Sequence, residues 1–495
     1  MARTVDQIAE ELKADASGPL EATVSDVTHD SRRAGRGALF VAITGLHHDG
    51  NTFVDAAMES GAVGVISEQP PPEGFTGAWL RVDDARRALP RAAAIVFGRP
   101  SEWLRLVGIT GTNGKTTTAY LIDRIVREGE DISALLGTVT YTVGRRKIKA
   151  DRTTPEAADI QRLLREAINE GCSTAVMEAS SHAIDLGRVD GLRFEVAVFT
   201  NLTQDHLDYH GTMEEYFAVK RRLFEGGTGS RPRWAIINAD DEFGRRLAAE
   251  HDGPMLRFGF DRSSDVRAES FELSLDGLHL ELATPLGPMT LNSPLIGKPY
   301  VYNLMAATST ALALGFSLET ICKALTHCSG APGRFETIAN TGGFAVAVDY
   351  AHSPDAVTKV LETAREVTKG RVICVFGCGG DRDRTKRAPM GEAAGAGCDL
   401  AIVTSDNPRS EDPVQIISDA EVGLKAAGRP YLAIADRRDA IFRAIDEAVA
   451  GDIVVIAGKG HEDYQIFADR TIHFDDREVA REALEARGLG MGAIR

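Results

Sequence analysis

Short apolar runs alternate with segments of helical periodicity along most of the chain, a pattern typical of parallel sheets with helices on their faces. The run from Trp103 to Ile109 predicts a buried strand. After Lys115, the residues Ile122, Ile125 and Val126 follow at helical spacing. This part of the chain therefore predicts a strand, a glycine-rich turn and a helix.

The same alternation recurs from Phe344 to the end of the chain and predicts a doubly wound, Rossmann-like domain. Its strands are expected at 345–348, 372–376, 400–403, 431–434 and 453–456. Between residues 255 and 295 the period changes to two, and Asp276-Gly277 separates two such runs as a hairpin signal. We expect a small antiparallel piece there, followed by an Ala-rich helix over 303–314.

The residues before Pro100 predict a smaller α/β unit, with strands at 37–42 and 62–66 and a helix at 53–60. Linkers are expected at 98–101 and 329–334, and a surface loop at the proline-rich stretch 69–74. The predicted fold class is α/β with three domains. These are a small N-terminal α/β domain (1–101), a central P-loop-type parallel sheet with the antiparallel piece appended (102–332), and the C-terminal doubly wound domain (333–495).

Composition narrows the class of protein. Of 495 residues, 43% are hydrophobic, and 56 basic against 72 acidic residues give a formal charge of −16, which argues against general nucleic-acid binding. No segment has the apolar length of a signal peptide or a membrane span, so we expect a cytoplasmic protein without a membrane partner. The six cysteines form no C-x-x-C pair, and we expect reduced thiols.

The turn after the first of these strands carries candidate chemistry. Residues 108–116 read G-x-x-G-x-x-G-K-T, in which loop N–H groups and Lys115 suit phosphates and the Thr116 hydroxyl suits Mg²⁺. ATP is the expected ligand. The structural alternative is an ordinary glycine-rich turn with an incidental lysine.

Further polar groups follow predicted strands, where ligands of open α/β sheets collect. Glu178 ends a buried strand and is placed to meet the Mg²⁺ of a nucleotide, although it could instead cap the following turn. The run 201–210 contains two histidines and two aspartates, including His206, which is dense enough for a metal or phosphate site. Lys220 lies among apolar residues of a helix expected at 213–224, where a lysine usually extends to water.

Four more polar clusters follow strands of the C-terminal domain, at 349–352, 379–384, 405–409 and 458–462. A single cluster of this kind could be a capping loop. Four on one sheet edge indicate a binding face.

Together these stretches resemble the Mur ligase family along the whole chain. The resemblance rests on Asp30-Ser31-Arg32, the loop from Gly108 to Thr118, Thr153-Thr154-Pro155, Glu178-Ala179-Ser180-Ser181-His182, Asp205-His206-Leu207-Asp208, Gly333-Arg334-Phe335-Glu336, Asp349-Tyr350-Ala351-His352, Asp406-Asn407-Pro408-Arg409 and Gly458-Lys459-Gly460-His461-Glu462. So many ordered motifs are not expected by accident.

The resemblance implies an ATP- and Mg²⁺-dependent ligase. Such enzymes phosphorylate the terminal carboxylate of a growing peptide, and the amine of the incoming amino acid attacks the acyl phosphate. Within the family the motifs are most similar to members that add meso-2,6-diaminopimelate to UDP-N-acetylmuramoyl-L-alanyl-D-glutamate in peptidoglycan precursor synthesis. A monomer is expected.

The resemblance also implies roles for single residues. The catalytic residues would be Lys115, Lys220, Glu178 and His206, and the metal ligands Thr116, Glu178, His206 and Lys220 as a carbamate. ATP would contact Gly111, Thr112, Asn113, Gly114, Lys115, Thr116, Thr117, Asn303 and Arg334. The UDP-muramoyl-dipeptide would contact Ser31, Thr153, Thr154, Ser180 and Arg188. Diaminopimelate would contact Arg382, Asp406, Asn407, Pro408, Arg409, Gly458 and Glu462.

Three alternatives and two departures accompany this interpretation. An L-lysine-adding ligase should lack Arg409, because lysine has no distal carboxylate for a guanidinium to bind. A folylpolyglutamate synthase-like ligase should lack the motif 406–409, and a P-loop kinase or GTPase should lack the C-terminal domain. Leu186 stands where the family has a polar Gln, which weakens one expected substrate hydrogen bond, and Tyr300 stands where an Asn is expected, which weakens one adenine contact.

Overall fold

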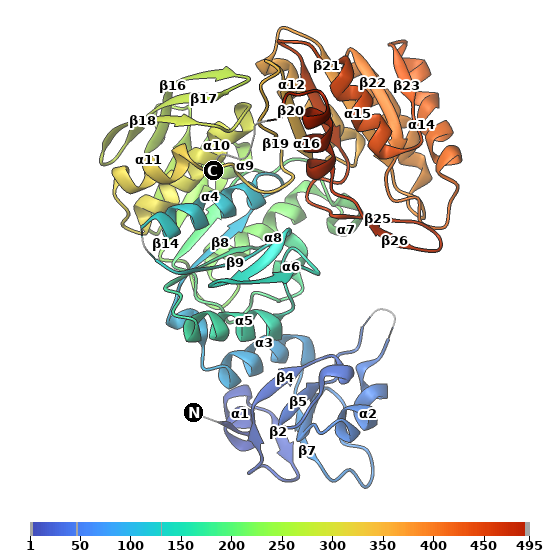
Figure 1. Cartoon of the computed structure of the whole chain (residues 1–495). Coiled ribbons are helices and arrows are strands. Elements are labelled where there is room, and N and C mark those ends of the chain that lie inside the picture. The colour runs from blue at the N-terminus through green and yellow to red at the C-terminus, as the bar shows by residue number, and fades with distance from the viewer. Residues whose placement is uncertain (1–2, 46–47, 130, 491–495) are drawn as a thin grey trace. The chain divides into compact units, whose positions relative to one another are not determined.

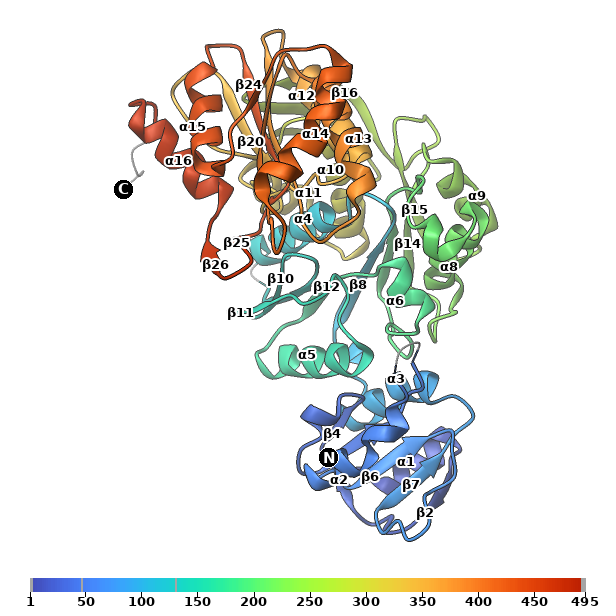
Figure 2. The same cartoon turned by 90° about the vertical axis from the view of Figure 1, so that its right-hand side faces the viewer.

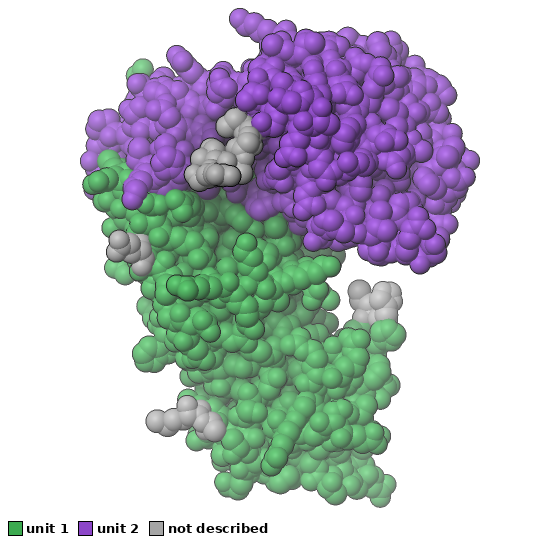
Figure 3. All heavy atoms as spheres, viewed as in Figure 1, with its two compact units in different colours: residues 1–267, 305–321 green, residues 268–304, 322–495 purple. Residues whose placement is uncertain are grey.

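The computed structural model describes residues 3–45, 48–129 and 131–490 and forms two compact units (Figures 1 and 3). The first unit comprises residues 1–267 and 305–321, and the second comprises residues 268–304 and 322–495. The predicted fold class is confirmed, since the chain builds a small N-terminal α/β sheet, a central and mostly parallel sheet, and a C-terminal doubly wound sheet.

The N-terminal sheet has the strand order β2-β7-β6-β5-β4 and is parallel except for its edge strand β2. Alternate residues of these strands face α1 and α3 on one side and α2 on the other, which gives two separate apolar clusters. The elements are β1 (Arg3–Thr4), α1 (Val5–Leu12), β2 (Asp15–Ser17), β3 (Thr23–Val24), β4 (Asp26–Thr28), η1 (Ser31–Arg33), β5 (Ala38–Val41), η2 (Gly50–Phe53), α2 (Val54–Glu59), β6 (Gly64–Ser67), β7 (Ala78–Arg81) and α3 (Ala85–Val96).

The central sheet continues the first unit with the order β11-β10-β9-β12-β8-β13-β14-β15, in which all strands but β10 and β11 are parallel. Its strands are β8 (Arg105–Thr110), β9 (Ser133–Leu136), β10 (Thr140–Val143), β11 (Arg146–Lys149), β12 (Thr174–Glu178), β13 (Val196–Phe199), β14 (Trp234–Asn238) and β15 (Met255–Gly259). Its helices are α4 (Lys115–Glu128), α5 (Ala157–Asn169), α6 (Ser181–Asp185), α7 (Leu207–His210), α8 (Met213–Glu225) and α9 (Glu242–Glu250).

The start of the first central strand differs from the prediction. Trp103 lies outside β8 with 74% of its surface exposed, because the chain first passes through the 3-10 helix η3 (Pro100–Glu102). Gly98 and Arg99 precede η3 in left-handed conformations and so turn the expected linker sharply. The strand begins only at Arg105, and the helix after the glycine-rich turn is confirmed.

The antiparallel piece is confirmed and has three strands, β16 (Val266–Ser274), β17 (Gly277–Thr284) and β18 (Gly287–Ser293). A Cβ at Gly277 would lie 2.2 Å from the carbonyl oxygen of Ser293, so the turn needs glycine there. The Ala-rich helix α10 (Lys298–Ala313) starts five residues earlier than predicted, and α11 (Leu318–Thr326) follows it.

The C-terminal sheet has the order β19-β20-β24-β21-β22-β23, and all five predicted strands are present. Its strands are β19 (Glu336–Thr337), β20 (Ala345–Asp349), β21 (Val372–Cys378), β22 (Leu400–Ser405), β23 (Tyr431–Ala433) and β24 (Ile453–Ala457). The remaining elements are α12 (Pro354–Val367), η4 (Arg384–Lys386), α13 (Arg387–Gly397), α14 (Pro413–Ala427), α15 (Arg437–Glu447), the hairpin β25 (Tyr464–Ile466) and β26 (Thr471–His473), and α16 (Asp476–Ala486).

Helices cover both faces of this sheet. One apolar cluster joins α15 and α16 to alternate residues of the strands, while α12, α13 and α14 contact the sheet separately (Figure 2). Gly391 and Gly423 let α13 and α14 approach closely, since a Cβ at either would lie about 2 Å from a carbonyl oxygen of the other helix. The covered faces leave the strand ends to carry the polar loops.

Two composition-based expectations, on the cysteines and on membrane spans, can be compared with the structure. All six cysteines are free thiols, and five of them are buried, as predicted. Within the described residues, every helix is too short or too polar to cross a membrane. The same residues hold no group of three or more His, Cys, Asp or Glu side chains arranged for a metal ion.

Candidate functional site

The glycine-rich loop between β8 and α4 is held from the side by the chain that follows β13. The Thr112 N–H donates to the carbonyl of Asn201 at 2.8 Å, and the Asn113 N–H donates to the Asn201 side-chain oxygen at 3.0 Å. A Cβ at Gly111, where φ is +145°, would lie 1.9 Å from the Thr200 hydroxyl oxygen. The sequence therefore fixes a close, glycine-dependent backbone approach at the N-terminus of a helix, the arrangement that suits phosphate binding.

Two lysine side chains converge on one carbonyl of this loop. The Nζ atoms of Lys115 and Lys220 each lie 2.9 Å from the carbonyl oxygen of Gly111, and Lys115 also donates to the Thr112 carbonyl at 2.9 Å. Lys220 comes from α8 and is buried, so it does not extend to water as a lysine on such a helix usually does. The apolar residues of α8 place it in the core, and the carbonyl supplies its hydrogen bond.

This environment disfavours a charge on Lys220. Burial removes water from its amine and holds its pKa well below the usual range of lysine, and the neighbouring Lys115 lowers the pKa further. Asp205 acts in the opposite direction. The Tyr216 ring lies under the amine with its centroid 4.6 Å away. The site therefore favours a neutral amine, which is the nucleophilic form.

Glu178 stands beside the loop because β12 pairs with β8 in a register that sets Glu178 opposite Ile109. Its Oε2 accepts from the Thr116 hydroxyl at 2.9 Å, and its Oε1 accepts from the Thr138 N–H at 2.7 Å. A Cβ at Gly137 would lie 2.4 Å from that oxygen. A buried carboxylate and a hydroxyl at this distance fit a hard cation such as Mg²⁺, which prefers oxygen ligands.

His206 lies among aromatic side chains of the first unit. It precedes α7 as its N-cap residue in a left-handed conformation, and its side chain is about half exposed. Its ring meets that of His182 edge to face at 4.9 Å, and His182 also contacts Tyr209 and His210. Burial and the neighbouring His206 lower the pKa of His182, so His182 favours the neutral imidazole form.

Three of the residues predicted for the muramoyl-peptide join Glu178 in one network. The Thr154 hydroxyl donates to the Glu178 carbonyl at 2.8 Å and accepts from the Ser180 N–H at 3.1 Å. The Thr153 hydroxyl lies 3.1 Å from that of Thr138, which in turn donates to the Glu178 carboxylate. Thr153, Thr154 and Ser180, which the sequence analysis assigned to one ligand, are therefore neighbours in the structure.

Arg188 lines a pocket of about 280 Å³ in the same unit. It forms an ion pair with Glu156 at 3.0 Å and donates to the Thr154 carbonyl. Burial, with the nearby Arg152 and Arg86, lowers the pKa of Arg188 against the effect of Glu156. Three guanidinium groups around one pocket suit an anionic ligand. Ser31 begins η1 and is absent from the described lining of this pocket, although His29 belongs to it.

Asn303 and Arg334, predicted for ATP, belong to the second unit. Asn303 is buried on α10, and the Arg334 guanidinium lies over the Tyr350 ring at 5.0 Å from its centroid. Tyr300, one of the two departures from the family pattern, is buried and donates its hydroxyl to the Arg334 carbonyl. This tyrosine therefore supports the loop at Arg334.

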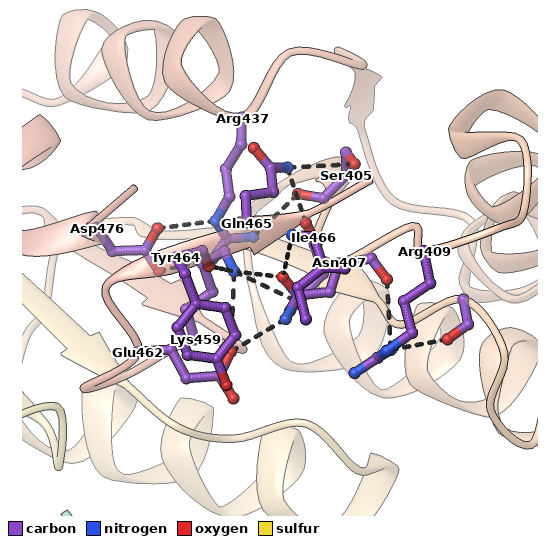
Figure 4. A network of polar contacts seen from close by, with 12 residues as sticks. Ser405, Asn407, Arg409, Arg437, Lys459, Glu462, Tyr464, Gln465, Ile466 and Asp476 are labelled. Atoms are coloured by element: carbon purple, nitrogen blue, oxygen red, sulfur yellow. Dashed lines mark hydrogen bonds and ion pairs between the residues drawn. The ribbon is translucent and has the colours of Figure 1, made fainter. Parts of the chain in front are cut away.

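The polar loops after β22 and β24 meet in the second unit (Figure 4). Asn407 donates from Nδ2 to Glu462 Oε2 at 3.0 Å, and a Cβ at Gly458 would lie 2.7 Å from Asp406 Oδ2. Arg409 has φ of +52° and donates from Nη1 to the Gly380 carbonyl at 2.7 Å.

The remaining predicted residues of this cluster lie beside the loop after β21. Arg382 is exposed, and both its Cγ and the Arg409 Nη1 lie within 3.5 Å of the Cβ position of Gly379. The Pro408 carbonyl packs against Gly380. The structure thus gathers all seven residues predicted for the amino acid at the carboxyl ends of β21, β22 and β24.

Sequence reasoning gave no role to four side chains that the structure adds to these sites. Thr138 holds Glu178, Arg86 and Arg152 line the arginine-rich pocket, and Lys459 is buried between Asp406 and Glu462. Thr138 and Lys459 each follow a strand of their sheets, so strand-end position was an available signal. Arg86 had no comparable signal, because it lies on a helix of the N-terminal part.

The buried Lys220 generates a stability prediction. A Lys220→Met variant is expected to melt roughly 2–4 °C above the wild type at pH 7 in CO₂-free buffer, because methionine fills the space without a buried amine. The Gly111 carbonyl keeps its hydrogen bond from Lys115 in this variant.

The sign of the pH dependence follows from the lowered pKa. Below the ordinary lysine pKa of about 10.4, unfolding lets Lys220 take up a proton, so the folded wild type bears a cost that fades as the pH rises to that value. Calorimetry between pH 7 and 10 should show the advantage of the variant shrinking, with Lys359→Met, an exposed lysine, as control. A variant that melts below the wild type across this range would contradict the account.

Comparisons with known proteins agree with this geometry. The model "Mur ligase family, catalytic domain" matches residues 23–104, "Mur ligase middle domain" matches 109–311, and "Mur ligase, glutamate ligase domain" matches 333–460. A relative from Solibacter usitatus, named UDP-N-acetylmuramoyl-L-alanyl-D-glutamate--2,6-diaminopimelate ligase, is 47% identical over 94% of each chain. A relative of that name from Geobacter metallireducens is 45% identical and covers 97% of this chain and 98% of its own.

A solved structure described by the same enzyme name has a TM-score of 0.73 and 34% sequence identity. It covers 99% of this chain, and the match includes 100% of the solved chain. The resemblance predicted from the motifs is confirmed along the full length: the chain belongs to the Mur ligase family.

Proposed function

We propose that this protein is the ATP-dependent ligase that joins meso-2,6-diaminopimelate to UDP-N-acetylmuramoyl-L-alanyl-D-glutamate in peptidoglycan precursor synthesis. The near full-length relatives of that name support the assignment. The structural observation that carries it is the convergence of Lys115 and Lys220 on the Gly111 carbonyl, next to the Thr116 and Glu178 pair. This arrangement combines a lysine that can neutralise phosphate charge, a pair of oxygen ligands for a cation, and an unusual buried amine.

ATP binding is assigned to the loop from Gly111 to Thr117, with Asn303 and Arg334 as further contacts. Lys115 stabilises the charge that develops on the transferred phosphoryl group. Thr116 and Glu178, with His206 and a carbamate on Lys220, would hold Mg²⁺. When bound, Mg²⁺ neutralises phosphate charge.

The carbamate on Lys220 is part of this proposal. A neutral amine attacks CO₂, loses a proton and becomes an anion. The burial of Lys220 and its proximity to Lys115 favour the neutral form, and the product anion would face the Lys115 ammonium. The modification thus replaces a repulsion by an attraction.

The UDP-muramoyl-dipeptide is assigned to the first unit, at Ser31, Thr153, Thr154, Ser180 and Arg188. The pocket lined by Arg188 supports an anionic ligand, and the two further arginines that line it extend the predicted set. A cytoplasmic monomer with domain limits at 1–101, 102–332 and 333–495 completes the proposal.

Diaminopimelate is assigned to the cluster of Arg382, Asp406, Asn407, Pro408, Arg409, Gly458 and Glu462. It differs from L-lysine by a carboxylate on the distal carbon, which a planar guanidinium binds with paired N–H donors. Backbone carbonyls hold Arg409 through Nη1, which fixes the direction of its other donors. This observation favours diaminopimelate over L-lysine, and the names of the relatives argue against a folylpolyglutamate synthase-like ligase.

Acceptor preference tests the assignment of Arg409. The wild type should use meso-diaminopimelate at least about a hundredfold more efficiently than L-lysine by kcat/KM, because lysine leaves a desolvated guanidinium without its anion. Arg409→Ala should lose this preference. Arg438→Ala, on the solvent side of α15, should keep it. Equal use of both amino acids by the wild type would sink the acceptor assignment.

Chemical rescue tests the carbamate. Lys220→Ala should lose nearly all ligase activity and regain part of it with a short carboxylic acid such as acetate, which replaces the missing anion. Lys115→Ala should also be inactive but gain nothing from acetate, because its missing charge is positive. A high-resolution structure of the active, CO₂-equilibrated enzyme with an unmodified Lys220 amine would rule the carbamate out.

A further inference from the structure

Lys459 is a buried lysine to which the proposed reaction assigns no role. It is the second residue of the loop after β24, and its side chain is fully buried. Figure 4 shows it pointing toward Asn407 and Glu462, two of the residues assigned to the acceptor amino acid. A buried ammonium requires partners, and here those partners belong to the proposed binding site.

The contacts of the ammonium are specific. Its Nζ donates to the Tyr464 carbonyl at 2.6 Å and to Asn407 Oδ1 at 3.1 Å. It lies 3.7 Å from Asp406 Oδ1 and 3.8 Å from Glu462 Oε2. One positive charge therefore sits between two carboxylates and bonds directly to the amide beside them.

These contacts fix which way the Asn407 amide faces. Its Oδ1 accepts from Lys459 and also from the Ile466 N–H at 3.0 Å. A flipped amide would set its NH₂ group against two donors. Nδ2 is therefore directed to Glu462, to which it donates at 3.0 Å, so the orientation of the carboxylate follows from that of the amide.

A buried ion pair holds the backbone beneath this network. The Arg437 guanidinium pairs with Asp476 at 2.7 Å, and both side chains are fully buried. Arg437 also donates to the carbonyls of Ala457 and Ser405, the last residues of β24 and β22. The loops that carry Lys459 and Asn407 thus start from strand ends that one side chain connects.

Charge in the cluster is also set by Lys459. Burial and the neighbouring Asp406 raise the pKa of Glu462, while Lys459 and the Asn407 bond lower it. Burial lowers the pKa of Lys459, and Asp406 opposes that effect. An ammonium between Asp406 and Glu462 reduces the repulsion between the two carboxylates, which suits an incoming ammonium better than two bare carboxylates would.

We propose that Lys459 is a positioning residue for the acceptor amino acid. Its ammonium holds the Asn407 amide and the Glu462 carboxylate in the orientation that receives this amino acid. This inference rests on the proposed function. Lys459 acts through its neighbours, and its loss should weaken acceptor binding more than catalysis with acceptor bound.

The first experiment is a kinetic comparison of Lys459→Met with the wild type. The KM for meso-diaminopimelate should rise at least about tenfold, which corresponds to losing one hydrogen bond to a charged group. The kcat should change by less than about threefold, and the KM values for ATP and the UDP-muramoyl-dipeptide by less than about twofold. Lys359→Met, an exposed lysine of α12, is the matched control and should leave all four values unchanged.

A double-mutant cycle then tests whether Lys459 acts through Glu462. In a Glu462→Gln background, Lys459→Met should change the acceptor KM by much less than it does in the wild type, because the carboxylate it orients is absent. Independent effects of the two substitutions would overturn the proposal, as would an acceptor KM unchanged in Lys459→Met alone.

Failure of the inference and failure of the proposed function are distinguishable. A wild type that does not use meso-diaminopimelate refutes the function. An active wild type, together with independent effects in the double-mutant cycle or an unchanged acceptor KM in Lys459→Met, refutes only the role of Lys459. Thermal melting of each variant reports folding. If Lys459→Met does not fold, Lys459→Gln, which keeps a donor, should fold and show an intermediate acceptor KM. Loss of folding in both variants would overturn the proposal, because the contacts would then serve the fold.

Discussion

Crowding of two lysine amines around the Gly111 carbonyl is the constraint on which the central site depends. Lys115 and Lys220 each donate to this oxygen at 2.9 Å, although two ammonium groups so close repel each other. Lys220 is the buried member, so it is the one whose charge is suppressed. The glycine-rich loop, α8 and the carboxylate of Glu178 at the end of β12 therefore meet in one group of neighbouring polar and charged side chains.

The C-terminal cluster surrounds its buried lysine with different partners. There a single lysine lies between Asp406 and Glu462, and a fully buried ion pair between Arg437 and Asp476 supports the strand ends below. Removing one partner of a buried pair usually costs about 3–5 kcal/mol, which makes such pairs rigid supports. In the central site a second lysine adds to the effect of burial on Lys220, whereas in the C-terminal cluster Asp406 opposes the effect of burial on Lys459, which orients an amide.

Much of this organisation was predictable from residue patterns, because buried parallel strands are continuous apolar runs and their polar ends meet at one edge. The five C-terminal strands and the Asp276-Gly277 hairpin are of this kind. Trp103 was placed wrongly because hydrophobicity alone does not reveal that two left-handed residues turn the chain before β8.

Side-chain direction was the harder part of the site to predict. Helical spacing gave Lys220 no role, and only packing shows that it points into the core. Lys459 belonged to a recognised motif. Its bond to Asn407, however, depends on the meeting of two loops, and the two residues lie 52 positions apart in the sequence. Tertiary contacts of this kind have no periodicity to detect.

Transfer of oxygen from substrate to phosphate tests the central claim most directly. The terminal glutamyl carboxylate of the UDP-muramoyl-dipeptide would be labelled with ¹⁸O, and the inorganic phosphate released with ATP and meso-diaminopimelate analysed by mass spectrometry. An acyl phosphate forms when the carboxylate oxygen bonds to the γ-phosphorus and ADP leaves. Attack of the amine on the carbonyl carbon then breaks the C–O bond, so that oxygen departs with phosphate. The account predicts one ¹⁸O atom in phosphate for each amide formed, and unlabelled phosphate accompanying amide formation would contradict it.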